Sequence, residues 1–438
     1  MGGLQAIRAE VPGLFGLSVP IVVGLGASTL LGVTDSVMLA PLGPVPLAAV
    51  GLTGGVALIF YAAIYGLLTA LSVRIGAAYG AGAGRQIALI WRNGLALGAV
   101  VGLGGAVLMG LVWPLLPLIG QPADVLAAMG GYYAAIAVMM IPFAMLTAFK
   151  SACEAVDRPW MGTGFAFVAV AVNVPLNYAL IWGIGPLPML GLTGAGIATV
   201  VAESIALALA WGWWRRARST RRLRLRRPLV RSEMLATARE GAPLGALYVA
   251  ETGAMAVGTM MLGTFGTVAL AANQVAFSVG GLLYMVPLGI AGAVSIRIAQ
   301  ARGADLPGSL RPIAFAGLGM AVLWLSGSAL VLALAGAQIA ALITDAPEVV
   351  ALATVIFLVF ALMQVADGVQ STMLGALRGM SDTGYPAQVS MVAYWLVALP
   401  LGWLFAAWVG PAGIWLGFFV ALIGAGAALT RRFWRKTA

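Results

Sequence analysis

The sequence predicts an all-α membrane protein with twelve transmembrane helices in two six-helix bundles. Of its 438 residues, 62% are hydrophobic and only 9% are charged, which is too few charges to cover a soluble surface. Apolar runs of about 18 residues or more recur along the chain, as membrane-spanning helices require. The runs lack the alternation of a membrane β-barrel, and the 59 glycines suit helices that pack closely in lipid.

The same composition excludes several classes of function. A chain this poor in charge is not a soluble enzyme, a nucleic-acid-binding protein or a secreted module. Histidine is absent and Cys153 is the only cysteine, which excludes imidazole chemistry, internal disulfides and cysteine-ligated metal sites. We therefore expect no enzymatic activity, no cofactor and no nucleic-acid partner.

Each predicted span is an apolar segment bounded by Gly- and Pro-rich turns, such as Pro41–Pro44 and Gly185–Pro188. The twelve spans cover roughly residues 13–39, 46–72, 94–119, 127–149, 160–184, 190–214, 237–263, 268–294, 312–336, 349–376, 387–408 and 412–430.

The positive charges support this count. All 24 Lys and Arg residues fall before span 1 or after the even-numbered spans, so one side of the membrane carries every one of them. The positive-inside rule places this side, with both termini, in the cytoplasm. We therefore expect an integral multi-pass protein of the bacterial inner (plasma) membrane, active as a monomer.

The densest positive charge lies between the halves. Residues 215–231 contain nine arginines, which suits either a cytoplasmic linker or a segment that binds anionic lipid or a regulator. We expect an N-terminal lobe over residues 1–214, an Arg-rich linker over 215–235 and a C-terminal lobe over 236–438.

The two halves repeat each other at a nearly constant offset. Pro20 matches Pro243, and the segments at Leu47 and Ser72 match those at Leu270 and Ser295, all 223 residues apart. Six spans is an even number, so both halves enter the membrane from the same side as parallel repeats. Two such bundles leave a central cleft and can rock to give alternating access, which a transporter needs and a scaffold does not.

Four acidic residues lie inside predicted spans, and these are the main functional candidates. Because charge is costly in a membrane, Asp35, Glu203, Glu251 and Asp367 are expected to act in function. No basic residue lies clearly inside a span to pair with them. Each must therefore be protonated, hydrated, hydrogen-bonded or bound to a cation.

Polar neighbours mark two of these regions. Gln364, Asp367 and Gln370 share one face of span 10 with Ser371, and that face must line a cavity or a polar cluster. In span 5, Asn173 and Asn177 flank Pro175, which can free a backbone carbonyl. These oxygens and a nearby carboxylate would suit a hard cation, although amides also join helices without further function.

Further residues could line a substrate cleft. Methionines are mostly core residues, but some could form an adaptable pocket for apolar cations. The substrate-cleft candidates are Glu203, Tyr248, Met255, Gln274, Met363, Gln364 and Gln370.

At these residues the chain resembles the multidrug and toxin extrusion (MATE) family, in particular its NorM-like branch. The matching segments lie around Asp35 in span 1, Asn173–Tyr178 in span 5, Glu251 in span 7, Ala271–Ala276 in span 8 and Asp367–Gln370 in span 10. The resemblance covers essentially the whole chain. It implies a V-shaped pair of six-helix lobes that exports lipophilic organic cations against a proton or sodium gradient.

The resemblance also implies roles for individual residues. Asp35 with Asn173 and Asn177 would bind the coupling proton or Na⁺ in the N-terminal lobe, and Glu251 with Asp367 would do so in the C-terminal lobe. NorM-like members commonly carry a tyrosine four residues before the span-10 acid. This chain has Met363 there, so that hydroxyl is missing.

Two other classes of transporter fit part of the pattern. A major-facilitator transporter also has twelve spans in parallel halves, but the loop after span 2, AAYGAGAGRQ, lacks the acidic residue usual there. A flippase or exporter of lipid-linked molecules or metabolites from the same superfamily usually has a more cationic cavity and extra spans.

Overall fold

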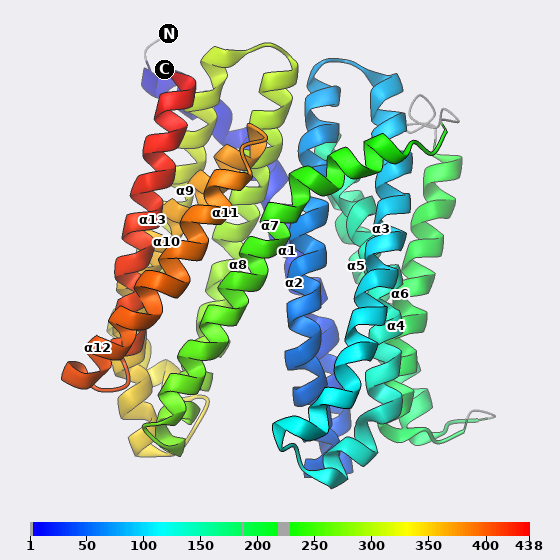
Figure 1. Ribbon diagram of the computed structural model, residues 1–438, viewed down its shortest axis with the longest axis vertical. Helices are drawn as coiled ribbons and strands as arrows, with labels where there is room; N and C mark the ends of the chain where they lie inside the picture. The colour runs from blue at the N-terminus through cyan, green and yellow to red at the C-terminus, as the bar shows by residue number, and fades with distance from the viewer. Residues whose placement is uncertain (1–2, 186–187, 218–227) are drawn as a thin grey trace. The chain divides into compact units, whose positions relative to one another are not determined.

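The computed structural model describes residues 3–185, 188–217 and 228–438, which are overwhelmingly helical and contain no strand (Figure 1). In the first half, the α-helices are α1 (Gly3–Leu39), α2 (Pro44–Gly80), α3 (Gly84–Val112), α4 (Ala123–Ala155), α5 (Pro159–Trp182) and α6 (Gly191–Arg216). In the second half they are α7 (Arg231–Gly263), α8 (Thr267–Gly303), α9 (Leu310–Ala341), α10 (Pro347–Gly379), α11 (Gly384–Met391), α12 (Leu399–Val409) and α13 (Gly413–Thr437).

The prediction of an all-α membrane protein is confirmed. Among the described residues, 11 helical segments are long and apolar enough to cross a membrane. Helices α11 and α12 join through the π-helical segment η5 (Val392–Ala398) into the single span Gly384–Val409. The remaining predicted span is α7, which is less apolar because it contains Glu251 and begins with several charged residues.

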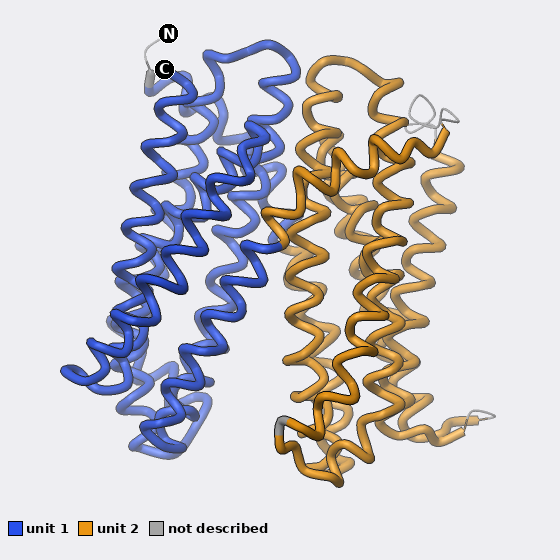
Figure 2. The backbone as a smooth tube through the Cα atoms, viewed as in Figure 1, with its two compact units in different colours: residues 1–22, 246–438 blue, residues 23–245 orange. Residues whose placement is uncertain are grey.

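The described residues form two compact units (Figure 2). Unit 1 comprises Met1–Val22 and Ala246–Ala438, and unit 2 comprises Val23–Gly245. Helix α1 therefore passes from unit 1 to unit 2 just after Pro20, and α7 passes back after Pro243. The lobe boundaries proposed from the sequence, at residues 214 and 236, remain a prediction.

Each unit is organised around one helix. In unit 2, α4 packs against α2, α3, α5 and α6, and in unit 1, α10 packs against α8, α9 and α13. Helix α4 is the fourth of the first six helices, and α10 is the fourth counted from α7. The central helix thus occupies the same position in both halves, as a duplicated bundle predicts.

Glycines allow close helix contacts inside unit 2. On α3, a Cβ added at Gly102 would lie 2.7 Å from Met140 O and Ile141 Cα of α4. One turn earlier, a Cβ at Gly98 would lie 3.1 Å from Ala144 O. In lipid, such small-residue contacts replace the hydrophobic driving force that joins helices in water.

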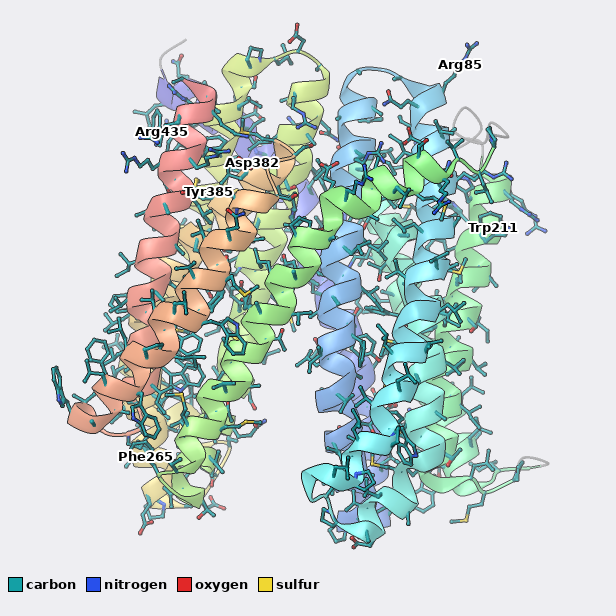
Figure 3. All side chains as sticks on the ribbon, in the orientation of Figure 1. Arg85, Trp211, Phe265, Asp382, Tyr385 and Arg435 are labelled. Atoms are coloured by element: carbon teal, nitrogen blue, oxygen red, sulfur yellow. The ribbon has the colours of Figure 1, made fainter. Side chains whose placement is uncertain are left out.

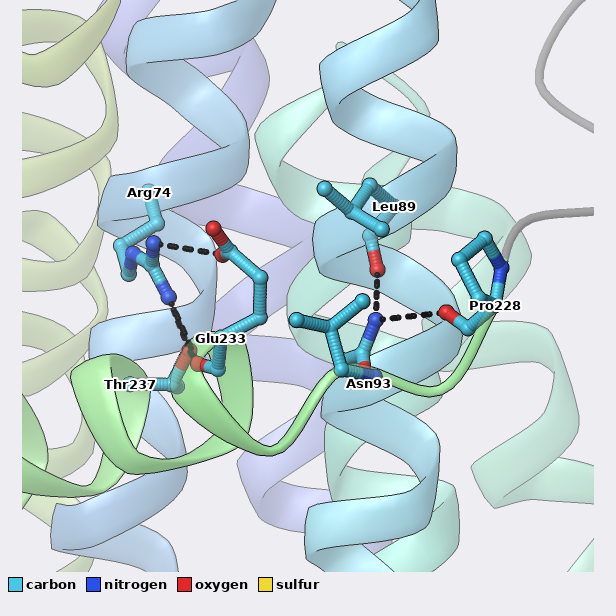
Figure 4. Close-up of polar contacts among 7 residues, drawn as sticks. Arg74, Leu89, Asn93, Pro228, Glu233 and Thr237 are labelled. Carbon is cyan, nitrogen blue, oxygen red and sulfur yellow. Dashed lines mark hydrogen bonds and ion pairs between the residues drawn. The ribbon is translucent and has the colours of Figure 1, made fainter.

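The start of α7 is fixed to unit 2 by polar contacts (Figure 4). Arg74 of α2 pairs with Glu233 at 2.8 Å and also donates to the Thr237 hydroxyl. Asn93 of α3 donates to Pro228 O at 3.4 Å and accepts from the Val230 amide at 2.7 Å. Residues 218–227 of the Arg-rich linker, with six of its nine arginines, lie outside the described residues.

In unit 1, a comparable cluster joins the α10–α11 turn to α13 (Figure 3). Asp382 accepts from Arg432 at 2.9 Å and pairs with Lys436 at 2.8 Å. Partial burial opposes ionisation of Asp382, but these hydrogen bonds and charges outweigh it and lower its pKa. Figure 3 places Asp382 and Arg435 near one end of unit 1, with Phe265 near the other.

We expect Gly102→Ala to destabilise the protein, because the new methyl group would meet the backbone of α4. The cost should be about 1–3 kcal/mol, typical of overpacking. Gly104→Ala is the matched control: it lies on the same helix with nothing within 4 Å of an added Cβ. Alanine is the better helix former, so this control should melt at or above the wild-type temperature. Thermal unfolding of the purified protein in detergent distinguishes the two, and equal melting temperatures would contradict the contact.

Candidate functional site

The first polar cluster lies inside unit 2 and is called here the Asp35 cluster. It joins Asp35 of α1, Tyr132 of α4, Asn173 and Asn177 of α5, and Thr199 of α6. Asp35 is only 3% exposed, and both asparagines are fully buried. The structure therefore brings together the three residues that the sequence assigns to this lobe and adds Thr199 and Tyr132.

Neutral donors surround the Asp35 carboxyl. Asn177 Nδ2 donates to Oδ1 at 2.6 Å, while Thr199 Oγ1 and Tyr132 OH lie 3.2 Å and 3.4 Å from Oδ2. Among the described residues, no ion pair involves Asp35. A negative charge here is thus hydrogen-bonded but not neutralised, so it can attract a proton or another cation.

The asparagines and Thr199 can hydrogen-bond with Asp35 whether its carboxyl is ionised or protonated. Asn177 also donates to Asn173 Oδ1 at 3.0 Å, and Asn173 donates to Thr199 at 3.1 Å. The Thr199 hydroxyl has a single proton yet lies within reach of both Asp35 Oδ2 and Ala195 O, 3.0 Å away. It can donate to an ionised Asp35, or it can donate to Ala195 and accept from a protonated Asp35.

The cluster also offers oxygen ligands to a cation. Asn177 Oδ1 has no hydrogen-bond partner in the part of the chain that the structure describes. Together with the carboxylate and hydroxyl oxygens nearby, it is the donor type that hard cations such as Na⁺ prefer. Helix α5 continues through Pro175, which keeps Asn173 and Asn177 on one face.

The second cluster lies inside unit 1 and is called here the Glu251–Asp367 cluster. Tyr394 hydrogen-bonds to Glu251 of α7, and Asp367 of α10 lies within electrostatic range of Glu251. Tyr284 of α8 lies in range of both acids. Asp367 is 8% exposed, and its Oδ1 has no hydrogen-bond partner among the described residues.

Three tyrosines surround these two acids, although Met363 occupies the position where the NorM-like pattern has one. Tyr248 comes from α7, Tyr284 from α8, and Tyr394 from the π-helical segment η5. Of these hydroxyls, that of Tyr394 hydrogen-bonds to Glu251. Sequence reasoning did not select Tyr284 and Tyr394, although a tyrosine inside an apolar span could have been such a signal.

Two basic residues lie closer to the spans than the sequence indicated. Arg378, expected after span 10, is 5% exposed in the last turn of α10, where it donates to Ser295 Oγ at 3.0 Å and hydrogen-bonds to Tyr248. Lys150, expected after span 4, lies within α4 and lines a cavity with Glu203. Helices α4 and α10 thus extend beyond their apolar cores and carry these two residues in their last turns, and the expectation that no basic residue lies clearly inside a span stays a prediction.

The remaining cleft candidates differ in exposure. Gln364 and Gln370 are buried and hydrogen-bonded, Gln364 with Ser328 and Gln370 with Ser390 at 3.4 Å. Met363 is buried in the hydrophobic core, and Met255 packs against the same core. Gln274 is exposed, Tyr248 is half-buried, and Glu203 is buried.

A duplicated bundle of membrane helices with carboxyls inside each half is the architecture of a membrane transporter. A family model described as MatE matches residues 20–179 and 243–404, so its two copies begin at the 223-residue offset of the predicted repeat. The chain belongs to the MatE family. It is therefore an integral multi-pass transporter and not an enzyme, and the major-facilitator alternative is wrong.

Similar proteins agree with this assignment. The chain is 32% identical to the "Multidrug resistance protein NorM" of Burkholderia vietnamiensis, over 90% of this chain and 87% of that protein. It is also 32% identical to a NorM protein of Deinococcus radiodurans, over 98% of this chain and 96% of that protein. The Vibrio cholerae MATE transporter VcmN in its bent form shares the fold, with a TM-score of 0.88, 22% identity and coverage of 99% and 98%. The predicted resemblance to the MATE family and its NorM-like branch is confirmed.

Proposed function

We propose that this protein exports lipophilic organic cations from the bacterial cytoplasm in exchange for protons or sodium ions, by alternating access. The observation that carries the proposal is the buried Asp35 carboxyl, whose described partners are all neutral donors. A mobile cation must balance its charge, and the coupling ion and a cationic substrate can compete for that role. The names of the NorM relatives support multidrug substrates.

The acidic clusters favour cations over anions. In a low dielectric, an anionic substrate would be repelled by Asp35, Glu251 and Asp367 whenever they are ionised. A lipophilic cation gains both electrostatic attraction and burial of its apolar groups. This preference argues against the alternative of a flippase for anionic lipid-linked molecules.

Ion gradients can supply the energy that export requires. One charge crossing 100 mV supplies about 2.3 kcal/mol, and one pH unit adds about 1.4 kcal/mol. Together they support a substrate concentration ratio on the order of 500-fold for each proton exchanged. The proposed site residues are Asp35, Asn173 and Asn177 in unit 2, and Glu251 and Asp367 in unit 1.

The three variants Asp35→Asn, Glu251→Gln and Asp367→Asn test the coupling. We expect each to lower gradient-driven export of a fluorescent cation from proteoliposomes by about tenfold or more, because an amide cannot exchange a proton and has no negative charge to balance a cation. Glu348→Gln, at an exposed position in the first turn of α10, is the matched control and should transport normally. Wild-type rates in all three variants, at equal reconstitution, would refute the assignment.

Competition between drug and coupling ion gives a second test. A protonated or Na⁺-bound carboxyl no longer attracts an organic cation, so the dissociation constant of the drug should rise as pH falls or as sodium concentration rises. Binding measured in detergent across both variables separates protons from sodium. Dissociation constants that are flat in both would contradict ion exchange even if transport were observed.

The orientation of the chain can be tested by cysteine labelling in a Cys153→Ala background. Ala438→Cys at the C-terminus should react with a membrane-impermeant reagent only from the cytoplasm, because the arginines lie at that end of α13. Ala346→Cys, exposed before α10, should react only from outside. Labelling from the opposite sides would overturn the proposed topology.

A further inference from the structure

A small cavity inside unit 2 lies apart from the Asp35 cluster. Its volume is about 40 Å³, and its walls come from α1, α4, α5 and α6. Four of its lining side chains are polar: Ser28, Thr147, Lys150 and Glu203. The others are apolar or glycine, so four polar residues line a mostly hydrophobic space.

Glu203, a cleft candidate from the sequence, belongs to neither of the two polar clusters and has an unusual environment. It is 6% exposed, and its Oε2 has no hydrogen-bond partner in the described part of the chain. No ion pair among the described residues involves it, and Lys150 lies 4.0 Å from Glu154 instead. A buried carboxyl oxygen without a partner is costly, so its presence calls for a ligand.

The cavity lies one to two helical turns from the Asp35 cluster, toward the end that carries the arginines. On α6, Glu203 follows Thr199 by four residues, which is one turn of about 6 Å on the same face. On α1, Leu31 and Ser28 line the cavity one and two turns before Asp35. Tyr61 lies within electrostatic range of both Glu203 and Asp35. Its ring packs against that of the cavity residue Phe143, with 4.8 Å between the ring centroids.

The volume of the cavity and the charges in its wall limit which ligands it can hold. An organic substrate needs roughly 300 Å³ or more. A water molecule needs about 10–15 Å³, so about three waters fit. The Lys150 ammonium in the wall opposes a metal cation such as Na⁺. Water and a proton remain as the species that this site can hold.

We propose that Glu203 is a proton relay: it accepts the coupling proton from the Asp35 cluster and passes it, through water in the cavity, to the basic end of unit 2. The proton leaves the Asp35 carboxyl for an intervening water, and that water gives a proton to the Glu203 carboxylate. Glu203 then returns a proton to the cavity water beside Lys150, and both carboxylates end ionised. This inference rests on the proposed exchange mechanism and assigns its proton a route.

Several titratable or polar side chains lie along this proposed proton route. Asp35 comes from α1, Tyr61 from α2, Lys150 from α4, and Thr199 and Glu203 itself from α6. The part of α5 that lines the cavity contributes Gly162 and Ala166, which carry no charge. On the proposed route the Lys150 cation therefore lies toward the basic end of Glu203, and the Asp35 carboxyl lies toward the other end.

Glu203→Gln tests the relay, with Glu203→Asp as the conservative variant and Glu348→Gln as the surface control. In proteoliposomes under a pH gradient, Glu203→Gln should slow drug export by about tenfold and slow proton release on drug addition equally. Its drug dissociation constant and melting temperature should stay within about twofold and a few degrees of wild type. Glu203→Asp should restore most of the rate, which a purely structural role would not predict.

These variants distinguish a failure of the proposed relay from a failure of the proposed antiport. If Glu203→Gln exports and releases protons as wild type while Asp35→Asn does not, the relay is wrong and the antiport stands. If neither variant differs from wild type, the relay and the role of Asp35 are both wrong, and the antiport itself is wrong when Glu251→Gln and Asp367→Asn also transport at wild-type rates. If sodium alone drives the wild type, the relay is wrong and sodium exchange remains.

A second variant covers the case in which Glu203→Gln does not fold. Lys150→Met removes the cation from the cavity wall beside the proposed water route. Drug export and proton release should then both slow several-fold at an unchanged drug dissociation constant, whereas wild-type rates of both would overturn the relay.

Discussion

One constraint governs this structure: carboxyl groups are buried among membrane helices, and not every carboxyl has a basic residue to pair with. Backbone groups in lipid are satisfied only within helices, so the chemistry must come from side chains that the helices carry inward. Asp35 is surrounded by neutral donors alone, Glu251 accepts a hydrogen bond from Tyr394, and Asp367 Oδ1 has no partner among the described residues. In both clusters a mobile cation can balance the negative charge, as the proposed ion exchange requires.

Because the two halves of the chain are repeats of one bundle, each half can carry its own buried acidic cluster. The central helices α4 and α10 hold equivalent positions in the repeat, yet their polar contents differ. Tyr132 of α4 only flanks the Asp35 carboxyl, whereas α10 itself carries Asp367. One bundle plan thus supports two clusters of different chemistry, because polar side chains can be exchanged while small residues preserve the backbone contacts.

Most of the fold and part of the site were predictable from the sequence. Long apolar runs, one-sided arginines and the 223-residue offset define the spans and the repeat, since each depends on local composition alone. Asp35, Asn173 and Asn177 could be selected because polar groups in apolar spans stand out. Tyr284 and Tyr394 are marked in the sequence only as tyrosines inside apolar spans. Their position near the two acids, like the cavity beside Glu203, depends on which helix faces which. The burial of Arg378 was missed because hydropathy does not show that α10 continues beyond its apolar core.

The two clusters also differ in what an added proton does to them. In the Glu251–Asp367 cluster, two negative charges within range of each other repel strongly in a low dielectric, so the pair gains from a cation even before substrate arrives. In the Asp35 cluster a single carboxyl is held by neutral donors, and Thr199 can reverse its hydrogen bond as the proton comes and goes. Under the proposed ion exchange, we expect the first arrangement to retain a cation and the second to exchange one. An exchange site also needs a route for its proton, and in unit 2 an unpartnered carboxyl lies one helical turn from Thr199, on the side of the arginines.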